Sequence, residues 1–132
     1  MTSENKPDQT GFDIHADTLK AIAHPVRLMI IEQLLLNPKC VMAIHEILDV
    51  RQSNISQHLT ILRNSGIVSS DSDGSYRCYY LRRPGFVRAV TDALKKDWPE
   101  TDIEEVRKKF KKAQNNRLNK QGVYPRNGEF DG

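Results

Sequence analysis

Hydroxyl and amide side chains alternate with apolar ones between Gln52 and Asn64. The apolar residues Ile55, Leu59 and Leu62 recur at positions i, i+4 and i+7, the spacing of one face of an α-helix. The positions between them carry groups that donate and accept hydrogen bonds, or a positive charge: Ser53, Asn54, Ser56, Gln57, Thr60 and Arg63. The segment therefore predicts a helix that buries one stripe and offers a hydrogen-bonding face to a polar partner.

Residues with sulfur or imidazole groups can bind a soft metal ion, and cysteine thiols can also be oxidised. Cys40, Met42 and His45 are close in sequence, and thiolate, thioether and imidazole suit Cu(I), with His15 as a further ligand. Cys78 is the second cysteine, and a redox pair with Cys40 needs Cα atoms within about 7 Å, which a sequence does not give. We prefer the plainer interpretation, in which Cys40 is a small apolar residue near a helix start and Cys78 faces the core from a strand.

Three helices are predicted before the Gln52–Asn64 segment. Residues 13–22 have apolar positions at helical spacing and end before Pro25. The next stretch, VRLMIIEQLLL, is apolar on nearly every face, so we expect it at the centre of the core. Val41, Ile44, Ile47 and Leu48 mark a third, short helix. A short polar turn then leads into residues 52–64, which gives two helices joined by a tight turn.

A hairpin and one more helix are predicted after it. Ile67-Val68 begins a strand, residues 71–74 form the turn, and residues 75–81 return as a strand rich in aromatic and β-favouring side chains. Pro84 opens a helix with one apolar stripe, made of Phe86, Val87, Val90, Ala93 and Leu94. The predicted fold is mainly α with a β-hairpin wing (α+β), a winged helix-turn-helix with the element order α-α-α-α-β-β-α.

Helix, turn, polar helix and hairpin together predict binding to double-stranded DNA. The major groove admits one helix, and hydroxyl and amide groups can bond base edges there. We expect Ser56, Gln57 and Thr60 to face the bases or the groove, and Ser53, Asn54 and Arg63 to contact phosphates. Gln52 belongs to the same expected DNA-binding set, and we expect Tyr76 and Arg77 of the wing to reach either phosphates or the neighbouring minor groove. His58 has two open alternatives, a packed, hydrogen-bonded histidine at the helix edge or a phosphate contact.

The stretches LKAIAHPVRLMIIEQLLLNPKC and SNISQHLTILRNSGIVSSDSDGSYRCYYL resemble the ArsR/SmtB family of winged-helix repressors. The resemblance covers residues 19–98. It implies a homodimer built from the first helix and the helix after the wing, an inverted-repeat operator, and release from DNA by an inducer. The operator and the protein's own second copy are thus the expected partners.

The inducer-binding motifs of the family match this chain less well than its other motifs do. Metal-sensing relatives begin the third helix with Cys-Val-Cys or Cys-Val-Gly, and here Cys40 matches while Met42 and Ala43 depart from the pattern. A second family site needs Asp/His and His/Glu pairs on the helix after the wing, and residues 82–97 contain no histidine, so we reject that site. Some relatives sense oxidants through two cysteines, the second in that helix, whereas Cys78 falls in the wing strand. A soft metal ion and a thiol-reactive species both remain as inducer classes.

Length and composition set the remaining limits. With 132 residues and 38% hydrophobic content the chain builds one modest core, and its net charge of +3 permits a nucleic-acid partner without demanding one. No apolar run is long enough for a membrane span or leader, so we expect a cytoplasmic protein without a membrane partner. We expect a mobile arm at 1–11, the winged helix-turn-helix at 12–98, and a basic tail at 99–132 that is either a marginal helix or disordered.

Two rival functions compete with DNA binding. A winged helix can be a protein-interaction module that does not bind DNA, but such a module would expose aromatic or aliphatic anchors where this chain has Gln57, Thr60 and Arg63. An enzyme would need more than the Cys40 and His45 pair, which has no third orienting group. The stripe of residues 86–94 likewise has two interpretations, a dimer face or the closing layer of the monomer core, and we prefer the dimer face.

Overall fold

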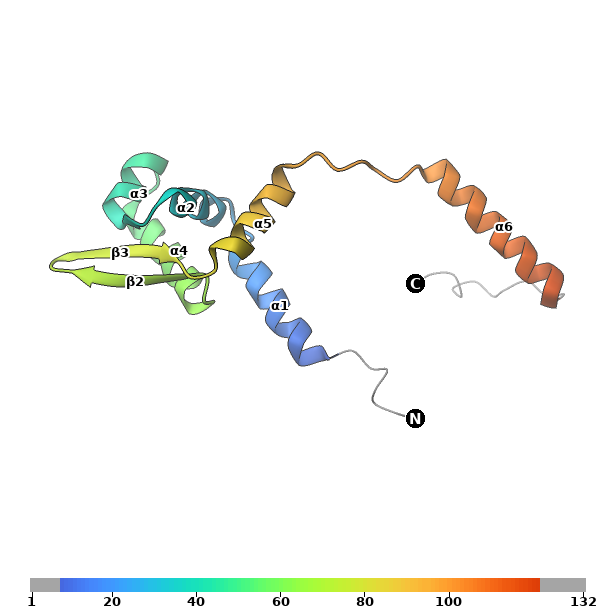
Figure 1. Cartoon of the computed structure of the whole chain (residues 1–132), viewed down its shortest axis with the longest axis horizontal. Coiled ribbons are helices and arrows are strands. Elements are labelled where there is room, and N and C mark those ends of the chain that lie inside the picture. Colours follow the sequence, from blue (N-terminus) through green and yellow to red (C-terminus); the bar gives the residue numbers. More distant parts are fainter. Residues whose placement is uncertain (1–7, 122–132) are drawn as a thin grey trace. The chain divides into compact units, whose positions relative to one another are not determined.

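The computed structural model describes residues 8–121, which fall into two compact units, one within residues 1–96 and one within 97–132 (Figure 1). The first holds five helices, α1 (Gln9–Ile22), α2 (Pro25–Leu36), α3 (Val41–Leu48), α4 (Gln52–Asn64) and α5 (Pro84–Lys95), with a small sheet. The predicted winged helix-turn-helix is therefore confirmed.

Helix α2 lies at the centre of the core, as its apolar sequence predicts. Ile30 and Ile31 are fully buried and Leu34 nearly so. The helix starts sharply, because Pro25 occupies its first turn and the backbone N–H of Val26 donates to Nδ1 of His24 at 3.0 Å. Side chains from α3, α4, α5 and the sheet pack around it into one cluster.

The turn inside the helix-turn-helix and its C-terminal end are fixed by local backbone geometry. After α3 the chain turns at Asp49, whose φ of 53° lies in the left-handed region that aspartate tolerates. After α4 it turns at Gly66, with φ of 78°, and the N–H of Ile67 donates to the carbonyl of Leu62 at 2.9 Å. This pattern is the Schellman termination that a glycine at this position favours.

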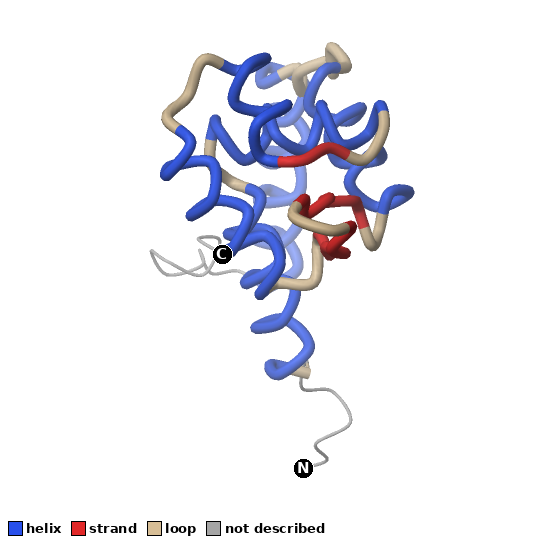
Figure 2. The backbone as a smooth tube through the Cα atoms, turned by 90° about the vertical axis from the view of Figure 1, so that its left-hand side faces the viewer, coloured by secondary structure: helices blue, strands red, loops and turns tan. Residues whose placement is uncertain are grey.

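The wing is part of a three-stranded antiparallel sheet with the strand order β1-β3-β2. Strands β2 (Val68–Asp73) and β3 (Tyr76–Leu81) form the hairpin, which projects from one side of the helical body in Figure 1. The expected turn at residues 71–74 is wrong in extent, because β2 runs to Asp73 and the chain reverses at Gly74, where φ is 64°. The third strand, β1 (Lys39–Cys40), was not predicted. Figure 2 views the body along the wing, with the strands in red.

The N-terminal end of the predicted domain plan differs from the structure in detail. Helix α1 begins at Gln9, so residues 9–11 are helical and do not belong to the expected arm. The rest of that arm up to residue 7 lies outside the described residues. In the second unit, α6 (Ile103–Gln121) is a helix with acidic residues in its first turn, and residues 122–132 lie outside the described part. Acids at a helix start suit the helix dipole.

Candidate nucleic-acid interface

Helix α4 has the two faces that its sequence pattern predicts. Ile55, Leu59 and Leu62 are completely buried, and all three belong to the core cluster. The other face is open to solvent along its whole length, with these exposed side chains: Gln52, Ser53, Asn54, Ser56, Gln57, Thr60 and Arg63. The buried stripe fixes the rotation of the helix, so these polar groups point away from the body.

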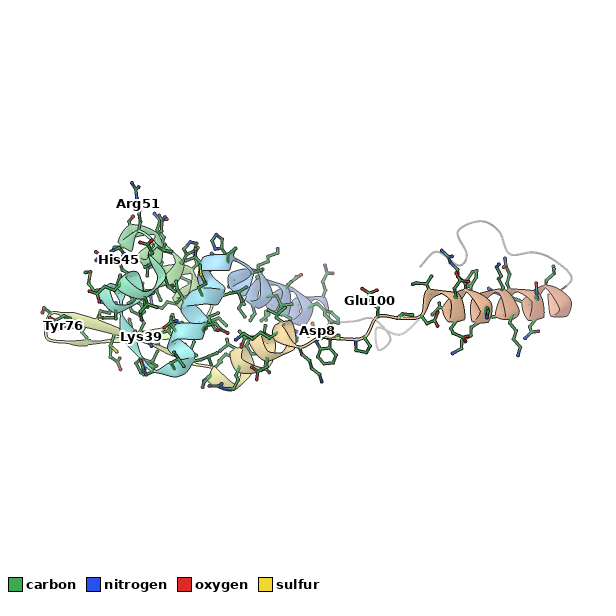
Figure 3. All side chains as sticks on the ribbon, turned by 90° about the horizontal axis from the view of Figure 1, so that it is seen from above. Asp8, Lys39, His45, Arg51, Tyr76 and Glu100 are labelled. Atoms are coloured by element: carbon green, nitrogen blue, oxygen red, sulfur yellow. The ribbon has the colours of Figure 1, made fainter. Side chains whose placement is uncertain are left out.

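The exposed polar groups keep most of their hydrogen-bonding capacity. Thr60 donates from Oγ1 to the carbonyl of Ser56, 2.9 Å away within the same helix, which leaves its lone pairs outward. On the wing, Tyr76 is 70% exposed and stands at the tip of the hairpin (Figure 3). Arg77 is also exposed, and its Nη1 lies 3.3 Å from Oγ of Ser70 on the neighbouring strand. This single hydrogen bond leaves the other N–H groups of the guanidinium available to an anion.

His58 has a different environment from the other predicted contact residues. It is half-buried, and its ring packs on that of His24 with centroids 4.3 Å apart. Burial lowers the pKa of His58, and the nearby His24 and Arg27 lower it further. These contacts favour the packed alternative for His58, in which a neutral ring joins α4 to the start of α2. The hydrogen bond expected with that packing is not found, because the buried Nδ1 of His58 has no partner among the described residues.

One candidate contact residue was missed from the sequence. Arg51 is exposed in the turn between α3 and α4, and Figure 3 shows its side chain reaching away from the body. It directly precedes Gln52, the first residue of α4, so it stands at the end of the polar face. A basic residue in a helix-turn-helix turn is the sequence signal that would have identified it.

The sulfur and imidazole residues are arranged differently from the expected metal set. Met42 is 47% exposed on α3, and Nδ1 of His45 lies 2.6 Å from the carbonyl oxygen of Val50. His15 is on α1, where it lines a hollow with Arg83 and Phe86. Among residues 8–121, no three His, Cys, Asp or Glu side chains lie close enough together to hold a metal ion.

The two cysteines, in contrast, are brought together. Cys40 of β1 and Cys78 of β3 are directly paired residues in the antiparallel sheet, and both thiols are free and half-buried. The interpretation that Cys78 faces the core is wrong. Tyr79 and Leu81 pack on the core cluster, and side chains alternate along a strand, so Cys78 lies on the opposite face of the sheet.

A second uncovered surface is apolar and lies on α1 and α5. Phe12, Ile14 and Leu19 of α1 are each more than half exposed, and Leu94 of α5 is 66% exposed. Beside Leu94, a groove of about 320 Å³ is lined by Leu28, Met29, Glu32, Thr91, Leu94 and Lys95. The stripe predicted on α5 is therefore divided, because Val87 closes the core while Leu94 does not.

The fold and its two surfaces define a winged helix-turn-helix protein. The model of the family described as bacterial regulatory protein, arsR family, matches residues 24–70, which contain the whole helix-turn-helix. In the part of the chain that the structure describes, no helix has the length and apolar content of a membrane span.

Similar proteins agree with this class. The chain is 34% identical over 88 residues to the HTH-type transcriptional repressor SmtB of Mycobacterium tuberculosis, a match that covers 67% of this chain and 65% of that protein. It is 40% identical over 67 residues to the uncharacterized HTH-type transcriptional regulator MJ1325 of Methanocaldococcus jannaschii, covering 50% of this chain and 75% of that protein. The crystal structure of NolR from Sinorhizobium fredii superposes with a TM-score of 0.62 at 30% identity, covering 71% of this chain and 93% of that chain.

The chain therefore belongs to the ArsR family of bacterial transcriptional regulators, as its sequence motifs predicted. The match spans about two thirds of the length of the SmtB repressor, 65%.

Proposed function

We propose that this protein is a transcriptional repressor that binds an inverted-repeat operator in double-stranded DNA as a homodimer. The observation that carries the proposal is the exposed polar face of α4, held outward by three fully buried residues, Ile55, Leu59 and Leu62. Ser56, Gln57 and Thr60 would meet base edges in the major groove. Gln52, Ser53, Asn54, Arg63 and the wing residues Tyr76 and Arg77 would meet the sugar-phosphate backbone.

The homodimer is proposed from the apolar surface on α1 and α5. Four large apolar side chains there are more than half exposed: Phe12, Ile14, Leu19 and Leu94. Large apolar side chains left exposed in this way mark a protein contact, and a second copy offers the same side chains in return. Two-fold symmetry would set two α4 helices about 34 Å apart, one turn of B-DNA, so that each reads one half-site.

Two inducer classes stay within the proposal. A soft metal ion would use Cys40, Met42 and His45, and a thiol-reactive species would use Cys40 and Cys78. The paired strand positions of the two cysteines favour the thiol-reactive class. The name of the SmtB relative, a transcriptional repressor, supports the direction of control. We further propose that the protein acts in the cytoplasm as a regulator and not as an enzyme.

The test starts from selection of bound duplexes out of a random library with the purified full chain. Fluorescence anisotropy on the selected duplex and on a scrambled one then measures specific and non-specific affinity between about 50 and 200 mM salt. We expect tight binding to the selected duplex at two chains per site, with a steep decrease as salt rises. No binding to any duplex at low salt would favour the interaction module instead.

A further inference from the structure

The pairing of Cys40 with Cys78 joins two thiols that are 38 positions apart in the chain (Figure 2 shows the strands that carry them). Strand β1 has only two residues, and Lys39 and Cys40 pair with Tyr79 and Cys78 of β3. Both cysteines are reduced and half-buried, so each sulfur is sheltered yet reachable by a small molecule. The sheet thus holds two thiols face to face in the folded protein.

The strand geometry lies within the range that a disulfide accepts. Residues directly opposite each other in an antiparallel pair have Cα atoms about 4.5–5.5 Å apart and Cβ atoms at a similar distance. A disulfide needs Cα atoms about 4.4–6.8 Å apart and Cβ atoms about 3.5–4.5 Å apart. A small movement of β1 toward β3 would therefore bring the two thiols into disulfide geometry.

The two strands connect to the two parts of the proposed DNA-binding surface. Cys40 is immediately followed by Val41, the first residue of α3, which packs against α4. Cys78 lies in the middle of β3, whose other neighbour is the outer wing strand β2. A bond between them would therefore tie the first helix of the helix-turn-helix to the wing.

We propose that Cys40 and Cys78 form a reversible cross-strand disulfide by exchange with a small disulfide such as glutathione disulfide, and that this bond weakens operator binding. The first part stands on the pairing alone, and the second rests on the proposed function. Closing the bond moves β1, and with it the start of α3, relative to the wing. Because α3 supports α4, the shift displaces the α4 and wing contacts from the spacing that one stretch of duplex requires.

The reaction is balanced by the small disulfide as oxidant. One cysteine loses its proton, and its thiolate attacks a sulfur of glutathione disulfide, which breaks that S–S bond, forms a mixed disulfide and releases one glutathione thiolate. The second cysteine thiolate then attacks the protein sulfur of the mixed disulfide and releases the second glutathione. Two electrons pass from the cysteine pair to glutathione disulfide, and the two cysteine protons end on the two glutathione thiols.

Mass spectrometry of the full chain equilibrated in glutathione buffers tests the chemical step. We expect the oxidised chain to lose two hydrogen atoms and both titratable thiols, to stay a single chain on a non-reducing gel, and to regain both thiols in excess glutathione. The Cys40→Ser and Cys78→Ser variants should instead each keep one glutathionyl group, because neither has a second thiol to release it. Two glutathionyl groups on the original chain, two unreacted thiols, or cross-linked pairs of chains would each overturn the site.

Anisotropy on the selected operator duplex tests the consequence. We expect the oxidised chain to bind about fivefold or more weakly than the reduced chain, and a Cys40→Ser/Cys78→Ser double variant to bind equally in both buffers. Equal affinity of the oxidised and reduced chains would remove the regulatory role while leaving the disulfide. Failure of the reduced chain to bind any duplex would instead count against the DNA-binding function, and the mass measurement would still decide the disulfide.

Discussion

Helix α4 and the pair α1 and α5 both leave one face uncovered, and the two faces are chemically opposite. The open face of α4 carries mainly hydroxyl, amide and guanidinium groups above a fully buried stripe, with Ile61 as an exposed apolar side chain among them. The open faces of α1 and α5 expose Phe12, Leu19 and Leu94 instead. A polar partner with hydrogen-bonding groups suits the first face, and an apolar partner suits the second.

One small core can support two surfaces that make different contacts. Residues such as Leu59 and Val87 close the core completely, so neither open face is needed for the fold of a single chain. Changes on either face should therefore affect binding and leave the fold intact, whereas changes beneath α4 should affect the fold first.

The largest effect is expected beneath α4. Leu59→Ala removes a completely buried side chain, and we expect the free energy of unfolding to fall by about 2–5 kcal/mol in urea denaturation. Thr60→Ala is the matched control on the open face, where we expect a change within about 0.5 kcal/mol. Similar losses for the two variants would show that α4 does not have one buried and one open face.

The next effect concerns the apolar faces. Leu94→Glu places a charge where we propose that a second copy packs, and we expect the dimer dissociation constant to rise about tenfold or more in sedimentation equilibrium. The unfolding free energy of the dilute chain should hardly change, since Leu94 is 66% exposed. Ala89→Glu, also exposed on α5, is the control. An unchanged dissociation constant for Leu94→Glu would place the dimer contact elsewhere.

On the open face of α4, Gln57→Ala should relax the preference at one base pair of each half-site. The expected cost is about 1–3 kcal/mol per half-site on the selected duplex, with non-specific affinity nearly unchanged. Anisotropy on duplexes substituted at single positions measures both quantities. An equal loss on every sequence would assign Gln57 to the phosphate backbone.

On the wing, Arg77→Ala should weaken all duplexes alike, because a phosphate contact carries no sequence information. We expect the slope of log affinity against log salt to flatten by about one unit per chain. Arg88→Ala removes the same charge from α5, where we propose no DNA contact, and should leave the slope unchanged. A slope that does not respond to Arg77→Ala would remove this residue from the interface.

The smallest effect concerns pH. The pKa of His58 is lower in the folded protein than in the unfolded chain, where it is about 6.5. At pH values between these two pKa values, the unfolded chain therefore binds more protons than the folded chain does. Stability should therefore increase as pH rises through this window and reach its full value above pH 6.5. Urea midpoints between about pH 5 and 7.5 measure it, and His58→Gln should flatten the dependence. A dependence of the opposite sign would contradict the packed, neutral His58.

The helices and their faces could be predicted from the sequence because the information is local. The spacing of Ile55, Leu59 and Leu62 specifies which side of α4 is buried, and Gly66 supplies the left-handed residue that ends it. The open polar groups of the same helix follow from that rotation. The misplaced wing turn has a local cause as well, since Asp and Ser residues are typical of turns although here they extend β2.

Contacts between distant segments could not be predicted in this way. A strand of two residues is too short to show a periodic pattern, so β1 could not be recognised in the sequence. The register that pairs Cys40 with Cys78 depends on where the end of α2 places the following residues beside the wing. The contact of His24 with His58 likewise joins two helices. The sequence alone determined which face of each helix is polar and which is apolar, because the spacing of the side chains places them on one face or the other. The tertiary structure decided which distant side chains meet, because that depends on how the elements pack.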